Sequence, residues 1–188
     1  SGQDDMESVD RVAHMLGIPY KVVDFQKEYW NGVFEPVLEA YQAGITPNPD
    51  VLCNKEIKFK TLSNFIFSRS PAPDYLATGH YAQLQADPTH PDTVNLCEAA
   101  DPNKDQTYFL LQVPQTSLRR VLFPIGHMLK PQVREIAAKA GLPNATRKES
   151  MGLCFVGKRK FDDFIGEFTA RPGSRPGTIT YIETGAPV

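Results

Sequence analysis

The chain has 188 residues, of which 41% are hydrophobic and 22% are charged, and its formal net charge is −2. This composition is that of a folded domain of ordinary size, so it excludes a disordered tail and a disulfide-stapled mini-protein. The longest apolar runs, such as residues 64–67 and 108–111, are far shorter than the ~20 residues that cross a bilayer, and we expect no membrane partner.

The first 50 residues predict two helices, a strand and a loop. Apolar side chains recur at helical spacing over residues 4–16 and again over 29–41, where Pro36 is expected to kink the second helix. A buried strand is expected at residues 20–24. The two prolines in residues 44–50 fix the backbone and remove two donors, which predicts a rigid loop.

The next elements alternate between helix and strand. We expect a helix from about Cys53 to Phe67 and a short strand over 75–78, with Gly79 and His80 directly after it. A glycine at the carboxyl end of a strand marks the edge where open α/β sheets bind ligands.

The second half of the chain continues the alternation. Strands are expected at 81–85 and 93–98, and helices are expected near 106–111, 116–122 and 131–140. The pattern predicts an α/β domain over residues 1–168. Residues 169–188 are expected to hold a linker at 171–177 and the first strand of another domain at 178–182.

Three cysteines, Cys53, Cys97 and Cys154, are an odd and widely spaced set. They fit neither a secreted disulfide framework nor a zinc site, so a reducing compartment is expected. The charge is unevenly divided, since residues 1–50 carry 3 basic and 9 acidic side chains whereas 106–188 carry 12 and 6. The later part is therefore suited to face a polyanion.

Cys53 and Cys154 each have a reactive and an inert interpretation. A helix start and Lys55 would favour a Cys53 thiolate, with Asp50 handling a proton; alternatively Cys53 is a buried hydrophobe and Asp50 a helix cap. The window 147–160 around Cys154 holds five basic residues and one acidic residue, which favours a thiolate and a phosphate backbone nearby. Alternatively, residues 153–156 form a core strand.

The remaining candidates are polar residues beside predicted elements. Cys97 is expected to be a core residue. In the loop before the helix at 106, Lys104 is suited to phosphate and Gln106 to a base edge, or else Asp105 only caps that helix. His80 is placed to touch a ligand or to serve a structural role, and no histidine pair has metal-ligand spacing.

Four ordered motifs resemble the tRNA-specific 2-thiouridylase family: residues 46–59, 77–81, 103–106 and 150–157. The form of residues 148–152 with 157–159 is more similar to the mitochondrial, eukaryotic branch, which makes a mitochondrial location the expectation and the cytoplasm the alternative. The resemblance implies an adenine-nucleotide α-hydrolase-like (ATP pyrophosphatase) domain with a parallel sheet. It lacks the family's first strand and pyrophosphate loop, and the start of a small β-rich central domain follows it.

The resemblance also implies an activity. Such an enzyme uses ATP with Mg²⁺ to replace the 2-oxygen of the wobble uridine in tRNAs for Lys, Glu and Gln. The sulfur arrives as a persulfide from a sulfur-carrier or cysteine-desulfurase-linked donor protein. Because no match to the first nucleotide-binding element is found here, we expect this polypeptide alone to bind ATP weakly and not to complete the reaction.

The family pattern assigns a role to each matched residue. Cys154 would carry the persulfide, Cys53 would resolve it, and Asp50 would be the acid/base neighbour. Asn48, Pro49 and Asp50 would surround the target base, and Gly79 would contact ATP. The residues expected to meet tRNA are His80, Lys104, Asp105 and Gln106. Two other functions stay open: an ATP pyrophosphatase for a small molecule, and a non-catalytic module that binds tRNA or a sulfur carrier.

Overall fold

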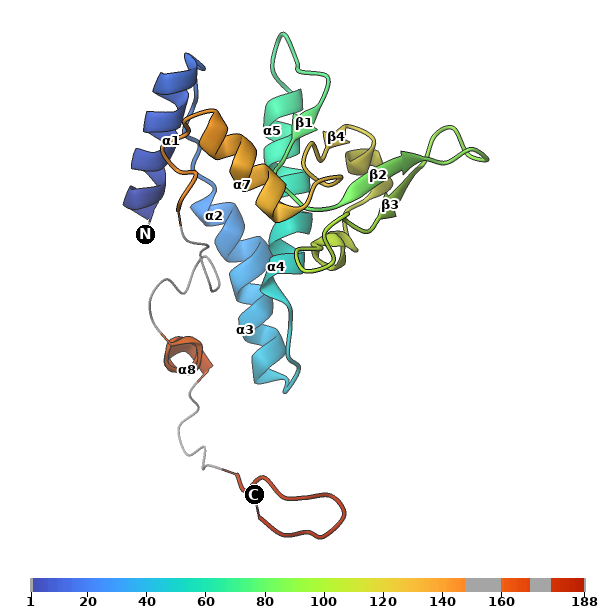
Figure 1. Ribbon diagram of the computed structural model, residues 1–188. Helices are drawn as coiled ribbons and strands as arrows, with labels where there is room; N and C mark the ends of the chain where they lie inside the picture. Colours follow the sequence, from blue (N-terminus) through green and yellow to red (C-terminus); the bar gives the residue numbers. More distant parts are fainter. Residues whose placement is uncertain (1, 148–159, 170–176, 188) are drawn as a thin grey trace.

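The computed structural model describes residues 2–147, 160–169 and 177–187 (Figure 1). Helices dominate the described part, and the strands form two small sheets. The α-helices are α1 (Gly2–Leu16), α2 (Gln26–Tyr29), α3 (Glu35–Gln42), α4 (Pro49–Leu52), α5 (Ser63–Phe67), α6 (Gln115–Leu118), α7 (Lys130–Lys139) and α8 (Phe161–Thr169). The π-helical segments are η1 (Trp30–Phe34) and η2 (Cys53–Leu62), and η3 (Thr107–Leu110) is a 3₁₀ turn. The strands are β1 (Leu76–Ala77), β2 (Gln83–Ala86), β3 (Val94–Cys97) and β4 (Val121–Leu122).

A continuous helical rod runs through α2, η1 and α3, as the second apolar stripe predicts. Pro36 lies in the first turn of α3, directly after the π-helical turns of η1. Proline lacks an N–H and its ring crowds the carbonyl four residues earlier, and a wider π turn relieves both problems. The rod ends before Gly44, whose φ of 78° suits a residue without a Cβ.

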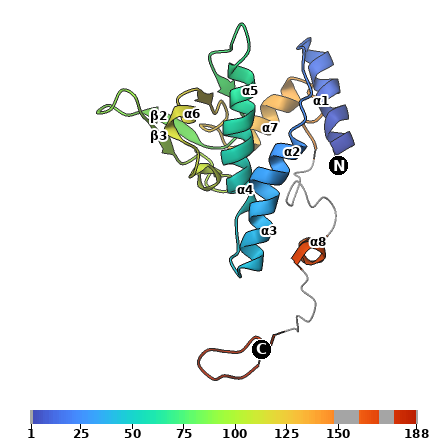
Figure 2. The same ribbon diagram turned by 180° about the vertical axis from the view of Figure 1, so that it is seen from behind.

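A second rod, formed by α4, η2 and α5, lies beside the first (Figure 2). It begins at Pro49, so the expected loop ends at Asn48 and the expected helix start at Cys53 is wrong by four residues. Proline is favoured in the first turn of a helix, where no N–H is needed, and Asn48 caps this turn. Cys53 therefore lies in the second turn, where the pull of the helix dipole on a thiolate is weaker.

The two sheets are a parallel pair and an antiparallel hairpin. Leu76 of β1 pairs with Val121 of β4, and the Thr78 N–H continues the ladder to the Leu122 carbonyl at 3.0 Å. The hairpin of β2 and β3 pairs Gln83 with Cys97. The coarse α/β prediction with a parallel pair is thus confirmed.

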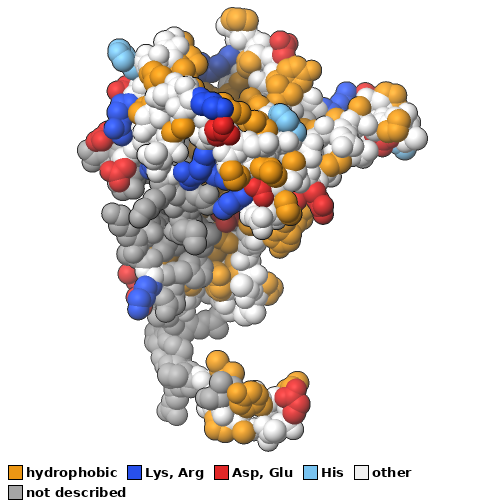
Figure 3. Space-filling model, viewed as in Figure 1, with side chains coloured by type: hydrophobic (Ala, Val, Ile, Leu, Met, Phe, Trp, Pro, Cys, Tyr) orange, Lys and Arg blue, Asp and Glu red, His pale blue; other side chains and the backbone are white. Residues whose placement is uncertain are grey.

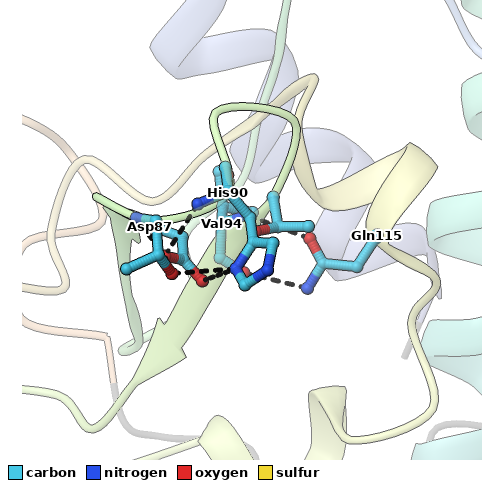
Figure 4. A network of polar contacts seen from close by, with 6 residues as sticks. Asp87, His90, Val94 and Gln115 are labelled. Atoms are coloured by element: carbon cyan, nitrogen blue, oxygen red, sulfur yellow. Dashed lines mark hydrogen bonds and ion pairs between the residues drawn. The ribbon is translucent and has the colours of Figure 1, made fainter.

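Side chains hold the outer parts of the hairpin (Figure 4). The Gln115 amide bonds both the N–H and the carbonyl of Val94, at 3.0 and 2.9 Å, and so mimics a neighbouring strand. In the turn, the Asp87 carboxylate accepts bonds from Thr89 and His90. The bonds from Thr89 contribute most to holding the pKa of Asp87 down to about 2.

The core lies between η2, the hairpin and the segment from η3 to β4. Its buried side chains are Phe59, Ala82, Leu110, Val113, Leu118 and Val121. Gly126 closes this region, since a Cβ there would lie 1.7 Å from the Ala82 carbonyl oxygen. A second cluster joins Phe34 of η1 to Phe164 and Ile165 of α8.

Four predicted elements differ from the structure. Residues 20–24 form no strand, because a strand needs a hydrogen-bonded neighbour and no described strand pairs with this segment. The helix expected at 116–122 ends at Leu118, because residues 121–122 pair with β1 and form β4. Residues 178–182 contribute only an isolated bridge, Thr180 to Pro187.

The expected helix at 106–111 is the 3₁₀ turn η3. Residues 153–156 and most of the expected linker lie outside the described residues.

Candidate nucleotide and tRNA site

The start of the second rod presents the first candidate residues. The Asn48 Oδ1 accepts the N–H groups of Asp50 and Val51 at 3.0 and 3.2 Å, which fixes the first turn. The cap is therefore Asn48, and the interpretation of Asp50 as the cap is wrong. Pro49 is buried, and no described residue hydrogen-bonds the half-buried Asp50 carboxylate. Asp50 and Cys53 are three residues apart, so they are neighbours on one helix face.

A buried hydrogen-bond network connects this rod to two other segments. Asn54, which follows Cys53 and is 3% exposed, donates from Nδ2 to the Phe109 carbonyl at 3.1 Å. Its Oδ1 lies 3.1 Å from Nε2 of His80. The other ring nitrogen of His80 lies 2.8 Å from the Thr78 hydroxyl. One asparagine thus ties the helix of Cys53 to the end of β1 and to η3.

The network fixes the state of His80. Because the Asn54 amide donates to Phe109, its oxygen faces His80, so Nε2 carries the proton and Nδ1 accepts the Thr78 hydroxyl. The ring is 8% exposed and packs against Phe59 and Phe123. This burial, with the Lys58 charge, lowers the pKa of His80 to about 4, and the ring is neutral at pH 7.

The carboxyl end of β1 is open at Gly79. Gly79 is exposed, and an added Cβ would meet only the Ile125 Cδ1, at 4.0 Å. The chain's own packing therefore does not require glycine there. A backbone with no side chain at the edge of a parallel pair is suited to the close approach of a ligand such as a nucleotide.

The loop before η3 is rigid for structural reasons. The Asp105 carboxylate accepts the N–H groups of Thr107 and Ala99 at 2.6 and 3.3 Å. Gln106 exchanges two bonds with the Tyr81 backbone, one through its side-chain oxygen at 3.0 Å. Asp105 thus fixes the loop before η3, while the N-cap of η3 is Gln106 and no side chain caps it.

Lys104, Asp105 and Gln106 also line an open groove of about 900 Å³ between this loop, α7 and the segment after α7. Three further cations line it: Lys130, Arg134 and Arg147. In Figure 3, Lys and Arg side chains gather near the middle of the viewed face. Of the described acidic side chains, only Asp5 and Asp105 line the groove, and Arg147 pairs with Asp5. The surplus of positive charge suits a phosphate backbone.

The structure thus brings several predicted residues together. Asn54, which follows Cys53, bonds both His80 and the Phe109 carbonyl of η3, and the sequence did not reveal this role. Lys58 was missed too, although its spacing of four from Asn54 places both on one helix face. Cys154 lies outside the described residues. Cys97 is half-buried, so the expectation of a core position is met only in part.

Two further features bear on ligands. Among residues 2–147, 160–169 and 177–187, no group of three or more His, Cys, Asp or Glu side chains could hold a metal ion. No helix in the same ranges is both long and apolar enough to cross a bilayer.

The parallel pair flanked by helices, with an open glycine at its carboxyl edge, defines an α/β domain of the nucleotide-binding type. A family model described as "tRNA methyl transferase HUP domain" matches residues 1–158, and the chain belongs to this family.

Its curated relatives include proteins named tRNA-specific 2-thiouridylase MnmA. The chain is 48% identical to that of Lactococcus lactis subsp. cremoris over 97% of its own length and 47% of the relative's. It is 50% identical to that of Shouchella clausii, over 98% and 50%, and to that of Streptococcus mutans, over 97% and 48%. The chain therefore spans about half the length of these relatives. All three are bacterial, so they do not support the expected mitochondrial branch.

Proposed function

We propose that this chain forms the nucleotide- and sulfur-handling part of an enzyme that replaces the 2-oxygen of a tRNA wobble uridine with sulfur. The observation that carries the proposal is the Asn54 network. It bonds the helix that carries Cys53 to His80, which directly follows Gly79, and to η3, and the next residue, Tyr81, bonds Gln106. The expected sulfur, ATP and tRNA elements are thus adjacent. The printed names of the relatives support the same reaction.

The chemistry explains the need for ATP. A uracil carbonyl oxygen is a poor leaving group, and adenylation makes it an oxygen of the AMP phosphate, which sulfur then displaces. Mg²⁺, which arrives with ATP, screens the charge of the departing pyrophosphate. The open backbone at Gly79 fits a nucleotide, because a side chain would otherwise fill the space that the ligand needs.

The sulfur step needs two cysteines. In the proposal Cys154 carries a persulfide from a donor protein, and Asp50 moves a proton one helical turn before Cys53. In one route the terminal sulfur attacks C2 of the adenylated uridine and AMP leaves. The Cys53 thiolate then attacks Cys154 Sγ, which breaks its bond to the transferred sulfur, forms the Cys53–Cys154 disulfide and frees 2-thiouridine. In the other route the Cys53 thiolate attacks Cys154 Sγ first, which forms the same disulfide and releases hydrosulfide, and hydrosulfide then displaces AMP. Both routes bring the two Sγ atoms to ~2 Å at some stage, with Cα atoms within ~7 Å.

The tRNA has two proposed contact regions. Asn48, Pro49 and Asp50 surround the target base at the start of α4, and Lys104 to Gln106 meet the tRNA from the basic groove. The substrates proposed are the tRNAs for Lys, Glu and Gln. His80 is buried and its two ring nitrogens bond Thr78 and Asn54, so in the proposal it does not touch tRNA itself. It instead holds Asn54, and with it the helix that carries Cys53, in place. A mitochondrial location stays a proposal that rests on the form of residues 148–152 and 157–159 alone.

A thiolation assay tests the proposal. The full-length polypeptide that carries this sequence receives ATP, Mg²⁺, a persulfide donor and unmodified tRNA, and a mercury-containing gel retards thiolated tRNA. The wild type should give a retarded band, Cys154→Ser and Cys53→Ser should not, and the matched control Cys97→Ser should. ATP cleavage by the wild type without any retarded band would contradict the proposal and favour a small-molecule substrate.

A further inference from the structure

Lys58 differs from the neighbouring lysines of η2. Lys55 and Lys60 both pair with the Glu56 carboxylate, at 3.4 and 2.6 Å. The half-buried Lys58 instead points toward His80, with its Nζ 3.4 Å from the ring Nε2. Within the described residues Lys58 has no carboxylate partner.

His80 cannot compensate this charge. Its ring is neutral, and its Nε2 proton is committed to Asn54, so Nε2 has no lone pair for Lys58. The contact at 3.4 Å is thus one of proximity between an ammonium group and an N–H. A partly desolvated cation that lacks a counter-charge is costly, and an anionic ligand would remove that cost.

The position of Lys58 indicates which ligand. The Lys58 ammonium contacts the ring of His80, and His80 directly follows Gly79 at the carboxyl end of β1. This is the edge where the space beyond Gly79 is open and where α/β sheets place ligands. The groove that carries Lys104, Lys130 and Arg147 is lined by other residues and does not include Lys58.

We infer that Lys58 is a phosphate ligand for the nucleotide bound at the carboxyl end of β1, held in place from behind by His80 and Asn54. The inference rests on the proposed use of ATP. An ammonium fixed beside the phosphates offsets their negative charge and donates to their oxygens.

The test measures the binding of ATP and of tRNA separately, in the full-length polypeptide that carries this sequence. Lys58→Met keeps an unbranched side chain one atom shorter and removes its charge, and Lys60→Met is the matched control in the same helix. Lys58→Met should weaken ATP binding at least tenfold and leave tRNA affinity within twofold. Lys60→Met should leave both within twofold, and Lys58→Arg should recover most of the ATP affinity.

Stability distinguishes a ligand role from a structural one. Without ATP, Lys58→Met should melt no lower than the wild type, because it removes an uncompensated charge. A lower melting temperature with unchanged ATP affinity would overturn the inference. So would a loss confined to tRNA affinity, which would place Lys58 in the tRNA site. If the wild type binds no ATP, the proposed function itself fails. If the wild type binds ATP and Lys58→Met binds it equally tightly, only the inference about Lys58 fails.

Discussion

Substitution of Asn54 by alanine should destabilise the fold far more than the same change ten residues later in the same rod. Asn54 is 3% exposed and its side chain bonds both Phe109 and His80. Truncation leaves the Phe109 carbonyl and the His80 Nε2–H without partners. A buried group that loses its hydrogen bond costs about 1–3 kcal/mol. Because both sites are partly or wholly closed to water, we expect a total loss of about 3 kcal/mol.

Asn64 is the matched control, since it lies exposed in α5. There the change to alanine removes no hydrogen bond of the described residues and improves helix propensity, so stability should change by at most about 0.7 kcal/mol, upward. Urea unfolding of both variants, followed by far-ultraviolet circular dichroism, gives the two free energies. A loss below about 1 kcal/mol for Asn54→Ala would refute the view that this network holds three segments together.

Three further predictions follow from single contacts. Gly126→Ala should lower the free energy of unfolding by more than about 3 kcal/mol, because its Cβ would lie 1.7 Å from the Ala82 oxygen; an unchanged melting curve would contradict the close approach. Gly79→Ala should leave that free energy within about 0.5 kcal/mol yet weaken ATP binding in calorimetry, and an unaltered affinity would remove Gly79 from the nucleotide site. The pKa of His80 is lowered to about 4 in the folded state, so the unfolded chain binds more protons between pH 4 and 6.5. Stability should thus fall by about 3 kcal/mol as pH drops through that window, as measured by urea titration, and His80→Gln should remove this part of the fall.

Local signals predicted the elements that local sequence determines. Helix α7 has Pro131 in its first turn and Gly141 just after it, and Gly141 has the positive φ of 70° that such a cap requires. The strands expected at 81–85 and 93–98 are confirmed as β2 and β3, which flank a turn-rich segment and pair as a hairpin.

Elements that depend on distant partners were not predictable in the same way. Residues 121–122 form a strand only because they pair with β1, which lies 45 residues earlier in the sequence. In the sequence, Pro49 indicated a break in helical structure. The structure shows that Pro49 begins α4 and that Asn48 caps its first turn. The same limit applies to the site, because the role of Asn54 depends on His80, 26 residues away in sequence.

The fate of the uridine oxygen tests the central claim most directly. A tRNA whose wobble uridine carries ¹⁸O at position 2 is thiolated in the presence of ATP, Mg²⁺ and a persulfide donor, and the AMP is analysed by mass spectrometry. If the oxygen is adenylated and then displaced by sulfur, one ¹⁸O should appear in AMP for each thiolated tRNA. Thiolated tRNA accompanied by unlabelled AMP, with the ¹⁸O found in water, would contradict the account.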